Sequence, residues 1–282
     1  MKIAVTGATG FIGNHVIDCL IKEGHSIIAS SSNSQNAEKE SWFKSVKYIP
    51  YKIDSFISQN NLFEYFNQPD ALIHLAWQGL PNYHSLHHIE ENLMSGYFFL
   101  KNMVTNGLKN LTVAGTCLEY GMKSGKLSED LNPSPVTSYG IGKYSLFSFL
   151  KLLNEQTPFS LKWTRLFYTY GPGQNPNSLF PQLEQAIINK ATEFMMSGGE
   201  QIRDFYPVEK LASAIVQIAK QERITGAINC CSGTPVKVKD FVTGYLESKG
   251  ETLKLHLGFY PYLAYEPMEF WGDNSKLLAI LK

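Results

Sequence analysis

Short apolar runs alternate with amphipathic stretches along the first 166 residues of this chain. Such runs are typical of buried parallel strands, and apolar residues at helical spacing between them are typical of helices packed on a sheet. The predicted strands are 2–6, 26–30, 46–51, 70–76, 110–115 and 160–166, and the predicted helices are 11–23, 58–67, 88–106 and 139–154. This alternation predicts an α/β fold with a doubly wound parallel sheet.

The pattern changes after residue 166. Pro172, Pro176 and Pro181 interrupt the rhythm, and helices are predicted near 178–190, 207–220 and 238–249. We expect a first domain at 1–166 and a smaller C-terminal lobe at 167–282, with some segments of the second returning to the sheet. The aromatic stretch 259–271 fits no predicted element.

The first strand and helix are joined by a glycine turn. Gly7, Gly10 and Gly13 recur every three residues between the strand and the helix, and a second apolar strand follows. The first glycine permits a tight turn, the second lets the backbone approach a ligand, and the third lets the helix pack against the strand. The amide groups at the start of the helix would then face a pyrophosphate, so the segment predicts dinucleotide binding.

The end of the second strand bears on the choice of dinucleotide. Sites for NAD usually carry a carboxylate there for the ribose 2′-hydroxyl, whereas this chain has Ser30, Ser31, Ser32 and Asn33. These polar groups can donate to a 2′-phosphate, and we therefore expect NADP(H) rather than NAD(H). Asp54, after the third strand, is placed either to accept from an adenine amino group or to cap a loop.

A candidate catalytic group follows the fifth strand. Tyr139 and Lys143 are four residues apart and therefore share one face of the predicted helix, and Thr116 stands just beyond the strand upstream. A free phenol has a pKa of about 10, and a nearby ammonium together with an oxidised nicotinamide is expected to lower it toward about 7. Threonine, tyrosine and lysine together predict acid–base chemistry on a substrate oxygen.

Composition excludes several classes of protein. The 25 basic and 25 acidic residues balance, which argues against a nucleic-acid or membrane surface. The chain enters its first strand at once and has no long apolar run, so we expect no signal peptide, no membrane span and a cytoplasmic protein. The four cysteines have no CxxC spacing and are expected to be reduced thiols.

Motifs along most of the chain resemble the extended short-chain dehydrogenase/reductases, in the NAD-dependent epimerase/dehydratase branch that acts on nucleotide sugars. Besides the glycine turn and the three catalytic candidates, the matching segments are His74–Ala76, Asn92–Leu93, Gly115–Thr116, Glu119–Gly121, Arg165, Tyr170–Gly173, Arg203–Phe205 and Asn229. The resemblance implies a Rossmann fold and a homodimer that pairs the helices near 88–106 and 139–154.

The resemblance also implies roles for single residues. Cofactor contacts are expected from Gly7, Thr9, Gly10, Phe11, Ile12, Gly13, Ser30, Ser31, Ile53, Asp54, Leu75, Ala76, Trp77, Asn92, Phe167 and Tyr168. Substrate contacts are expected from Tyr83, Cys117, Glu119, Asn177 and Arg203, with Arg203 on the substrate pyrophosphate. Lys143 would in addition hold the nicotinamide ribose.

The segment 115–121 and the loop 77–88 look most like bacterial reductases of nucleotide-linked 4-keto-6-deoxy sugars, which serve surface polysaccharide biosynthesis. We therefore expect NADPH-dependent reduction of a 4-keto group. The rivals are an NAD-dependent nucleotide-sugar 4-epimerase with the same three residues and an inactive dinucleotide sensor. A dehydratase is disfavoured, because Cys117 and Leu118 stand where that group carries an acid pair.

Histidines 84, 87 and 88 lie close together in the loop after the fourth predicted strand and where it leads into the next helix. No acidic or cysteine ligand accompanies them at a useful spacing, and reduction of a ketone by hydride needs no metal. We expect a substrate-facing loop and no metal site.

Overall fold

A parallel sheet of seven strands forms the centre of residues 1–54 and 60–282, the part of the chain that the computed structural model describes. Its strand order is β12-β7-β5-β4-β1-β2-β3. The strands are β1 Lys2–Thr6, β2 Ser26–Ser30, β3 Lys47–Tyr48, β4 Ala71–His74, β5 Asn110–Thr116, β7 Ser160–Leu166 and β12 Gly226–Cys230. The strand order reverses between β1 and β4, and in such sheets ligands bind at the carboxyl ends of the strands beside this point.

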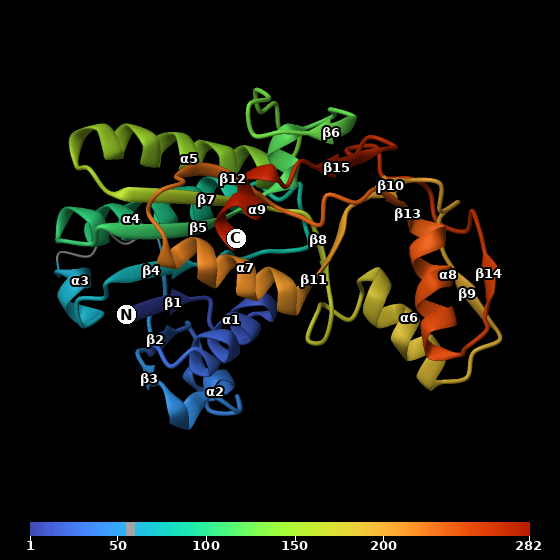
Figure 1. The fold of residues 1–282 in the computed structure, drawn as a ribbon, viewed down its shortest axis with the longest axis horizontal. Coiled ribbons are helices and arrows are strands. Elements are labelled where there is room, and N and C mark those ends of the chain that lie inside the picture. The colour runs from blue at the N-terminus through green and yellow to red at the C-terminus, as the bar shows by residue number, and fades with distance from the viewer. Residues whose placement is uncertain (55–59) are drawn as a thin grey trace.

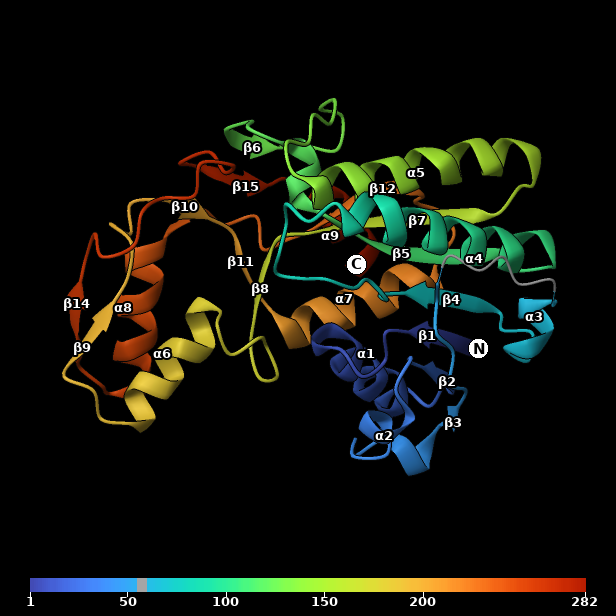
Figure 2. The same cartoon turned by 180° about the vertical axis from the view of Figure 1, so that it is seen from behind.

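Helices cover both faces of the sheet (Figures 1 and 2). One face carries α1 Phe11–Lys22, α7 Val208–Lys220 and α9 Ser275–Leu281, and the other carries α3 Leu62–Tyr65, α4 Met94–Thr105 and α5 Ser138–Gln156. Two short helices, α2 Ser34–Ala37 and the 3₁₀ turn Phe43–Ser45, follow β2, a π-helical turn His88–Leu93 leads into α4, and the 3₁₀ turn Cys117–Tyr120 follows β5. The apolar sides of α1 and α7 pack against strands rich in Ile, Val and Ala, which explains the predicted periodicities.

A smaller lobe stands beside the sheet (Figure 1). It contains α6 Leu179–Ile188, β9 Glu193–Met195, α8 Val238–Lys249 and β14 Lys254–His256, which share a separate apolar core around Leu183 and Val242. Short strand pairs connect it to the body: β8 Tyr168–Tyr170 with β11 Phe205–Pro207, β10 Ile202–Arg203 with β13 Val236–Lys237, and β6 Gly125–Leu127 with β15 Phe270–Gly272.

The doubly wound parallel sheet predicted from the sequence is confirmed. The third strand is shorter than predicted, and the helix predicted at 58–67 is reduced to α3, with residues 58 and 59 outside the described part. Strand β12 was not predicted, although it pairs with β7 at the edge of the sheet. The boundary at residue 166 stays a prediction, since α7, β12 and α9 follow it in sequence and pack with the body.

Within the described part of the chain, none of the helices combines the length and apolar character that a membrane span requires.

Candidate active site

The glycine turn after β1 is built for close approach. Gly7 has a φ of 73°, and a Cβ there would lie 2.8 Å from the amide nitrogen of Ala76. A Cβ at Gly13 would lie 2.1 Å from the carbonyl oxygen of Gly7, so neither position tolerates a side chain. Gly10 precedes α1 without a side-chain cap, and the first turn has no acidic residue. The helix start can therefore receive an anion, and these residues fit the pyrophosphate of a dinucleotide.

Several of the residues expected to contact the cofactor lie in or next to this turn. Thr9, Phe11 and Ile12 belong to the turn and the start of α1, and the Leu75 amide donates to the Thr6 carbonyl oxygen at 3.1 Å. Asn92, in the π-helical turn, donates from Nδ2 to the carbonyl oxygen of Gln78 at 2.9 Å. Its side chain therefore holds the loop after β4, and its contact with a cofactor stays a prediction.

Of the three serines at the end of β2, Ser30 and Ser31 are buried and Ser32 is exposed. The Ser31 hydroxyl lies 2.9 Å from the hydroxyl of Tyr48 on β3. The Asn33 side chain accepts from the amide of Asn36 and caps α2. Farther along, Ile53 and Asp54 line a cavity of only about 10 Å³. The roles of these residues toward a dinucleotide stay predictions.

The three catalytic candidates meet at the carboxyl end of β5. Tyr139 and Lys143 lie in the first two turns of α5, which begins after Thr137, whose side chain accepts from the amide of Gly140. The phenol of Tyr139 is in hydrogen-bond contact with the side chain of Thr116, and both residues are buried. The ammonium of Lys143 donates to the carbonyl oxygen of Ala114 at 2.7 Å.

Burial is the main cause of the pKa shifts at this site. Burial raises the pKa of Tyr139, Tyr83 and Glu119 raise it further, and the hydrogen bond with Thr116 opposes the change. This direction holds for the protein without a dinucleotide, and the lowering expected from Lys143 together with an oxidised nicotinamide stays a prediction. Burial lowers the pKa of Lys143 to about 7 while Glu119 raises it. The phenol is consequently protonated and able to act as an acid.

The loop 77–88 lies against the catalytic tyrosine. The amide of Tyr139 donates to the carbonyl oxygen of Tyr83 at 3.0 Å, and their rings lie 5.6 Å apart. Among the histidines of this loop, His84 packs on Tyr265 with ring centroids 5.0 Å apart, and His88 is buried. Across residues 1–54 and 60–282, no three His, Cys, Asp or Glu side chains are grouped as a metal site requires.

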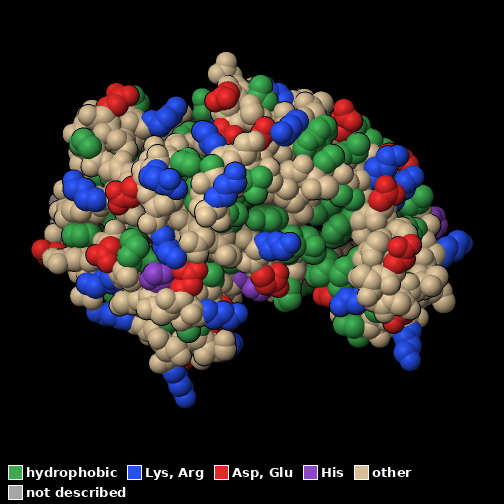
Figure 3. Space-filling model, viewed as in Figure 1, with side chains coloured by type: hydrophobic (Ala, Val, Ile, Leu, Met, Phe, Trp, Pro, Cys, Tyr) green, Lys and Arg blue, Asp and Glu red, His purple; other side chains and the backbone are tan. Residues whose placement is uncertain are grey.

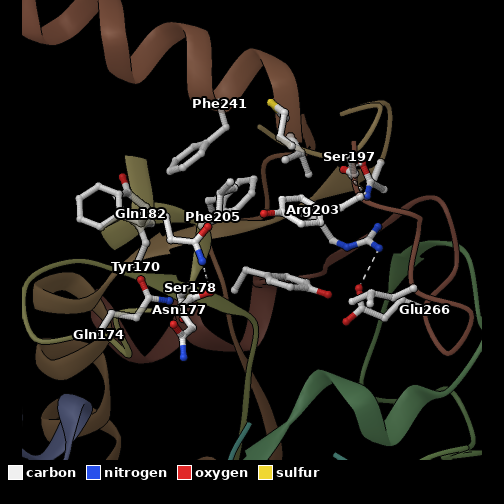
Figure 4. A pocket seen from close by; sticks show the side chains of 18 of the residues that line it. Tyr170, Gln174, Asn177, Ser178, Gln182, Ser197, Arg203, Phe205, Phe241 and Glu266 are labelled. Atoms are coloured by element: carbon white, nitrogen blue, oxygen red, sulfur yellow. Dashed lines mark hydrogen bonds and ion pairs between the residues drawn. The ribbon is translucent and has the colours of Figure 1, made fainter. Parts of the chain in front are cut away.

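A cavity of about 570 Å³ extends from Tyr83 into the lobe (Figure 4). In the view of Figure 3 the surface is hollowed between the body and the lobe, and hydrophobic side chains gather along this junction. Residues from the β8–β11 region, α6, α8 and the segment 260–266 line the cavity: Tyr83, Tyr168, Tyr170, Gln174, Asn177, Gln182, Arg203, Phe205, Phe241 and Glu266. The expected substrate residues Tyr83, Asn177 and Arg203 are thus brought to one cavity.

Arg203 is held in the wall of this cavity by an acidic partner. Its Nη2 lies 3.0 Å from Oε2 of Glu266, and its Nη1 donates to the carbonyl oxygens of Ile202 and Met268. The guanidinium also lies over the rings of Tyr168 and Phe270. The guanidinium charge is thus paired with Glu266 and its Nη1 group is directed to backbone carbonyls, so the contact of Arg203 with a substrate pyrophosphate stays a prediction.

Two expected substrate residues are corrected by the structure. Glu119 is fully buried, and its carboxylate accepts from the amide of Thr116 (2.9 Å), from Trp163 Nε1 (2.8 Å) and from Arg165 Nε (2.9 Å). It therefore supports the backbone at Thr116 and does not face substrate. Cys117 is buried in an apolar cluster, and burial raises its pKa. Of the two expected cofactor residues after β7, Phe167 is buried in the same cluster, whereas Tyr168 lines the cavity.

Sequence reasoning missed two residues of the aromatic stretch 259–271: Glu266, which lines the cavity, and Tyr265, whose ring packs against Tyr83 and His84. Neither belongs to a motif or to a periodic element. The only signal was the density of aromatic residues around them.

The chain matches the model of the NAD dependent epimerase/dehydratase family over residues 3–231. It belongs to this family. Its similarity to dTDP-6-deoxy-L-talose 4-dehydrogenase (NAD(+)) of Aggregatibacter actinomycetemcomitans is 30% identity over 278 residues, covering 96% of this chain and 99% of that protein.

Two further similar proteins have names that give different reactions. GDP-6-deoxy-D-talose 4-dehydrogenase of the same organism is 24% identical over 286 residues, covering all of this chain and 91% of that protein. The solved structure of UDP-glucuronic acid 4-epimerase from Bacillus cereus, in complex with UDP-glucuronic acid and NAD, superimposes with a TM-score of 0.84. It covers all of this chain and 93% of that one at 24% identity, which shows a shared Rossmann-like fold.

Proposed function

We propose that the protein reduces the 4-keto group of a nucleotide-linked 6-deoxyhexose, with NADPH as the hydride donor. The observation that carries this proposal is the position of the Tyr139 phenol, which contacts Thr116 at the carboxyl end of β5 and packs against Tyr83 in the wall of the cavity. Two relatives are named as 4-dehydrogenases of 6-deoxytalose nucleotides, and such an oxidation read backwards is a 4-keto reduction.

Each residue of the site has its own role in the proposed reduction. The dinucleotide, when bound, supplies a hydride to sugar C4. The Tyr139 hydroxyl donates its proton to the oxygen on C4, so that the ketone becomes an alcohol, and the tyrosine recovers a proton from water. The Thr116 hydroxyl donates a hydrogen bond to the same oxygen as charge develops there. Lys143 stabilises the phenolate that Tyr139 leaves behind.

The nucleotide part of the substrate would occupy the cavity in the lobe. Arg203 would bind the pyrophosphate, Asn177 would contact the same group, and Tyr83 would lie over the sugar next to Tyr139. Cys117 and Leu118 supply no acid near Thr116, which argues against elimination of water from the sugar. We further propose that the protein forms a homodimer through α4 and α5 and that it is cytoplasmic.

A nucleotide-sugar 4-epimerase is the second candidate, and the 25% identity to UDP-glucose 4-epimerase of Neisseria meningitidis serogroup C, over 97% of this chain and 89% of that protein, favours it. An epimerase uses the same three residues but returns the hydride to the opposite face of C4. It must therefore retain its dinucleotide, whereas a reductase must exchange it in every cycle.

The two candidates are separated by stoichiometry. With a 4-keto-6-deoxy sugar nucleotide we expect loss of nicotinamide absorbance equal to about one NADPH per alcohol formed, and little dinucleotide bound to the purified protein. A screen of dTDP-, CDP- and GDP-linked sugars by mass spectrometry identifies the substrate. Interconversion of two C4-hydroxyl sugars without a net change of absorbance would establish the epimerase instead.

The preference for NADPH is tested at β2. Ser31→Asp places a carboxylate that repels a 2′-phosphate and accepts from a 2′-hydroxyl, so it should reverse or abolish the preference. Calorimetric titration of the wild type and the variant with both dinucleotides measures this. Equal or tighter binding of NADH by the wild type would contradict the NADPH assignment and would agree with the NAD(+) in the relative's name.

A further inference from the structure

The ammonium of Lys143 lies on the face of an indole. Its Nζ is 4.0 Å from the centroid of the Trp77 ring, and it donates to the Ala114 carbonyl oxygen at 2.7 Å. Lys143 is only 2% exposed, so its charge is withdrawn from water. A cation over the face of tryptophan is attracted by the ring quadrupole, and the attraction is strongest where water is excluded.

The indole is itself fixed by His88. Trp77 Nε1 donates to His88 Nδ1 at 3.1 Å, and the two rings stack at an interplanar angle of 22°. His88 Nε2 lies 2.8 Å from the carbonyl oxygen of Asn82. Because an indole N–H only donates and a carbonyl only accepts, His88 must be the neutral tautomer with its proton on Nε2. The loop thereby sets the orientation of the ring under Lys143.

Other ionisable groups face Lys143 from the elements around it. Glu119, in the 3₁₀ turn after β5, raises the pKa of Lys143, while burial lowers it to about 7. His74 on β4 and His88 on the π-helical turn both have their pKa lowered by burial and by the charge of Lys143. Tyr139 shares the helix and is protonated. Glu119 and the Trp77 face are thus the groups that favour the ammonium.

We propose that Trp77 is a positioning residue that keeps Lys143 charged and in place beside Tyr139, with His88 fixing the orientation of the indole. The effect on turnover rests on the proposed function, whereas the contact between the ammonium and the indole does not. Removing the aromatic face should favour the neutral amine and so lower the pH at which Lys143 loses its proton.

The contact is tested without substrate by tryptophan fluorescence. Between pH 5 and pH 9.5, Trp77 emission should change in a single-proton transition as Lys143 titrates. Trp271→Phe, a matched control on β15, should keep this transition, and both Trp77→Phe and Lys143→Met should lose it. Persistence of the transition in Lys143→Met, or in Trp77→Phe, would overturn the proposal.

The role in turnover is tested by the pH profile of kcat/KM with saturating dinucleotide, whichever reaction the stoichiometry has established. In Trp77→Leu the alkaline limb should move about one pH unit lower, with roughly tenfold lower activity at pH 8. Trp77→Phe, which keeps a weaker aromatic face, should move it less. If the alkaline limb were unchanged and only KM were altered, Trp77 would line the site without acting on Lys143, and the proposal would be wrong.

Folding and function are separated in this design. Circular dichroism establishes that each variant is folded, and if Trp77→Leu is not, Trp77→Phe carries the test. If no sugar nucleotide reacts, the proposed function fails while the fluorescence transition still decides whether the indole senses Lys143.

Discussion

At the scale of single residues, burial keeps the candidate acid, Tyr139, in its protonated form. Tyr139 is enclosed by Tyr83, Thr116 and the loop after β4, and this enclosure raises its pKa and keeps its proton. A protonated phenol suits reduction, in which the oxygen on C4 must gain a proton. The reverse oxidation needs the phenolate, which a bound cationic nicotinamide would favour.

Replacing Tyr139 by phenylalanine removes the proton donor and leaves the ring. We expect turnover to fall roughly 100-fold or more, while dinucleotide affinity and thermal stability stay close to those of the wild type. Thr116→Val removes one hydrogen bond to the reacting oxygen and should cost less. Steady-state kinetics measures both, and Tyr144→Phe on the same helix is the matched control. Near-normal activity of Tyr139→Phe would contradict the assigned role.

The sequence identified residues that belong to local motifs better than it assigned their roles. Thr116, Tyr139 and Lys143 were found because their spacing and position after a strand reflect chemistry. Glu119 was assigned to substrate, since nothing local shows that Trp163 and Arg165 of the neighbouring strand fill its carboxylate. Glu266 was missed because its partner Arg203 is 63 residues away in sequence.

At the scale of elements, the periodic segments of the body were predictable because each buries one face on the sheet. Strand β12 was not, since Gly226–Cys230 begins with Gly and mixes Asn with Ala and Ile. Its pairing with β7 decides its conformation, and that partner is distant in sequence. The lobe strands were missed for the same reason, as each has only two or three residues.

The glycine turn gives a prediction at this scale. Gly13→Ala would place a Cβ 2.1 Å from the Gly7 carbonyl oxygen and 2.8 Å from that of Ala8, both backbone atoms. We expect a lower melting temperature and loss of dinucleotide binding, because α1 must move away from β1. Gly244→Ala in α8 meets nothing within 4 Å and should instead stabilise the protein by about 0.5–1 kcal/mol. Calorimetry compares the two, and an unaffected Gly13→Ala would contradict the tight packing described here.

At the scale of the whole molecule, one face of α5 carries exposed apolar side chains. Ile141, Phe149 and Leu152 on α5 are exposed by 39%, 36% and 59%. Phe149 also meets Tyr97 of α4, with ring centroids 5.5 Å apart. Apolar side chains gathered on one face in this way are typical of a surface that binds a second copy.

Leu152→Glu tests the proposed homodimer. A charge at this position would be buried without a partner in a dimer paired through α4 and α5, so we expect monomers. Ile188→Glu on α6 changes a still more exposed apolar side chain outside this face and should leave the dimer intact. Light scattering coupled to gel filtration gives both masses. A monomeric wild type, or a dimer that survives Leu152→Glu, would exclude this pairing.

The path of the chain between body and lobe has a consequence for recombining this protein with its relatives. The chain leaves the sheet after β7, returns as α7 and β12, leaves again for α8 and β14, and ends on the sheet as α9. A chimera with a single breakpoint would therefore split either the body or the lobe between two parents. To transplant specificity, an engineer must exchange the segments 171–204 and 232–272 together, so that both halves of the Leu183–Val242 core come from one parent.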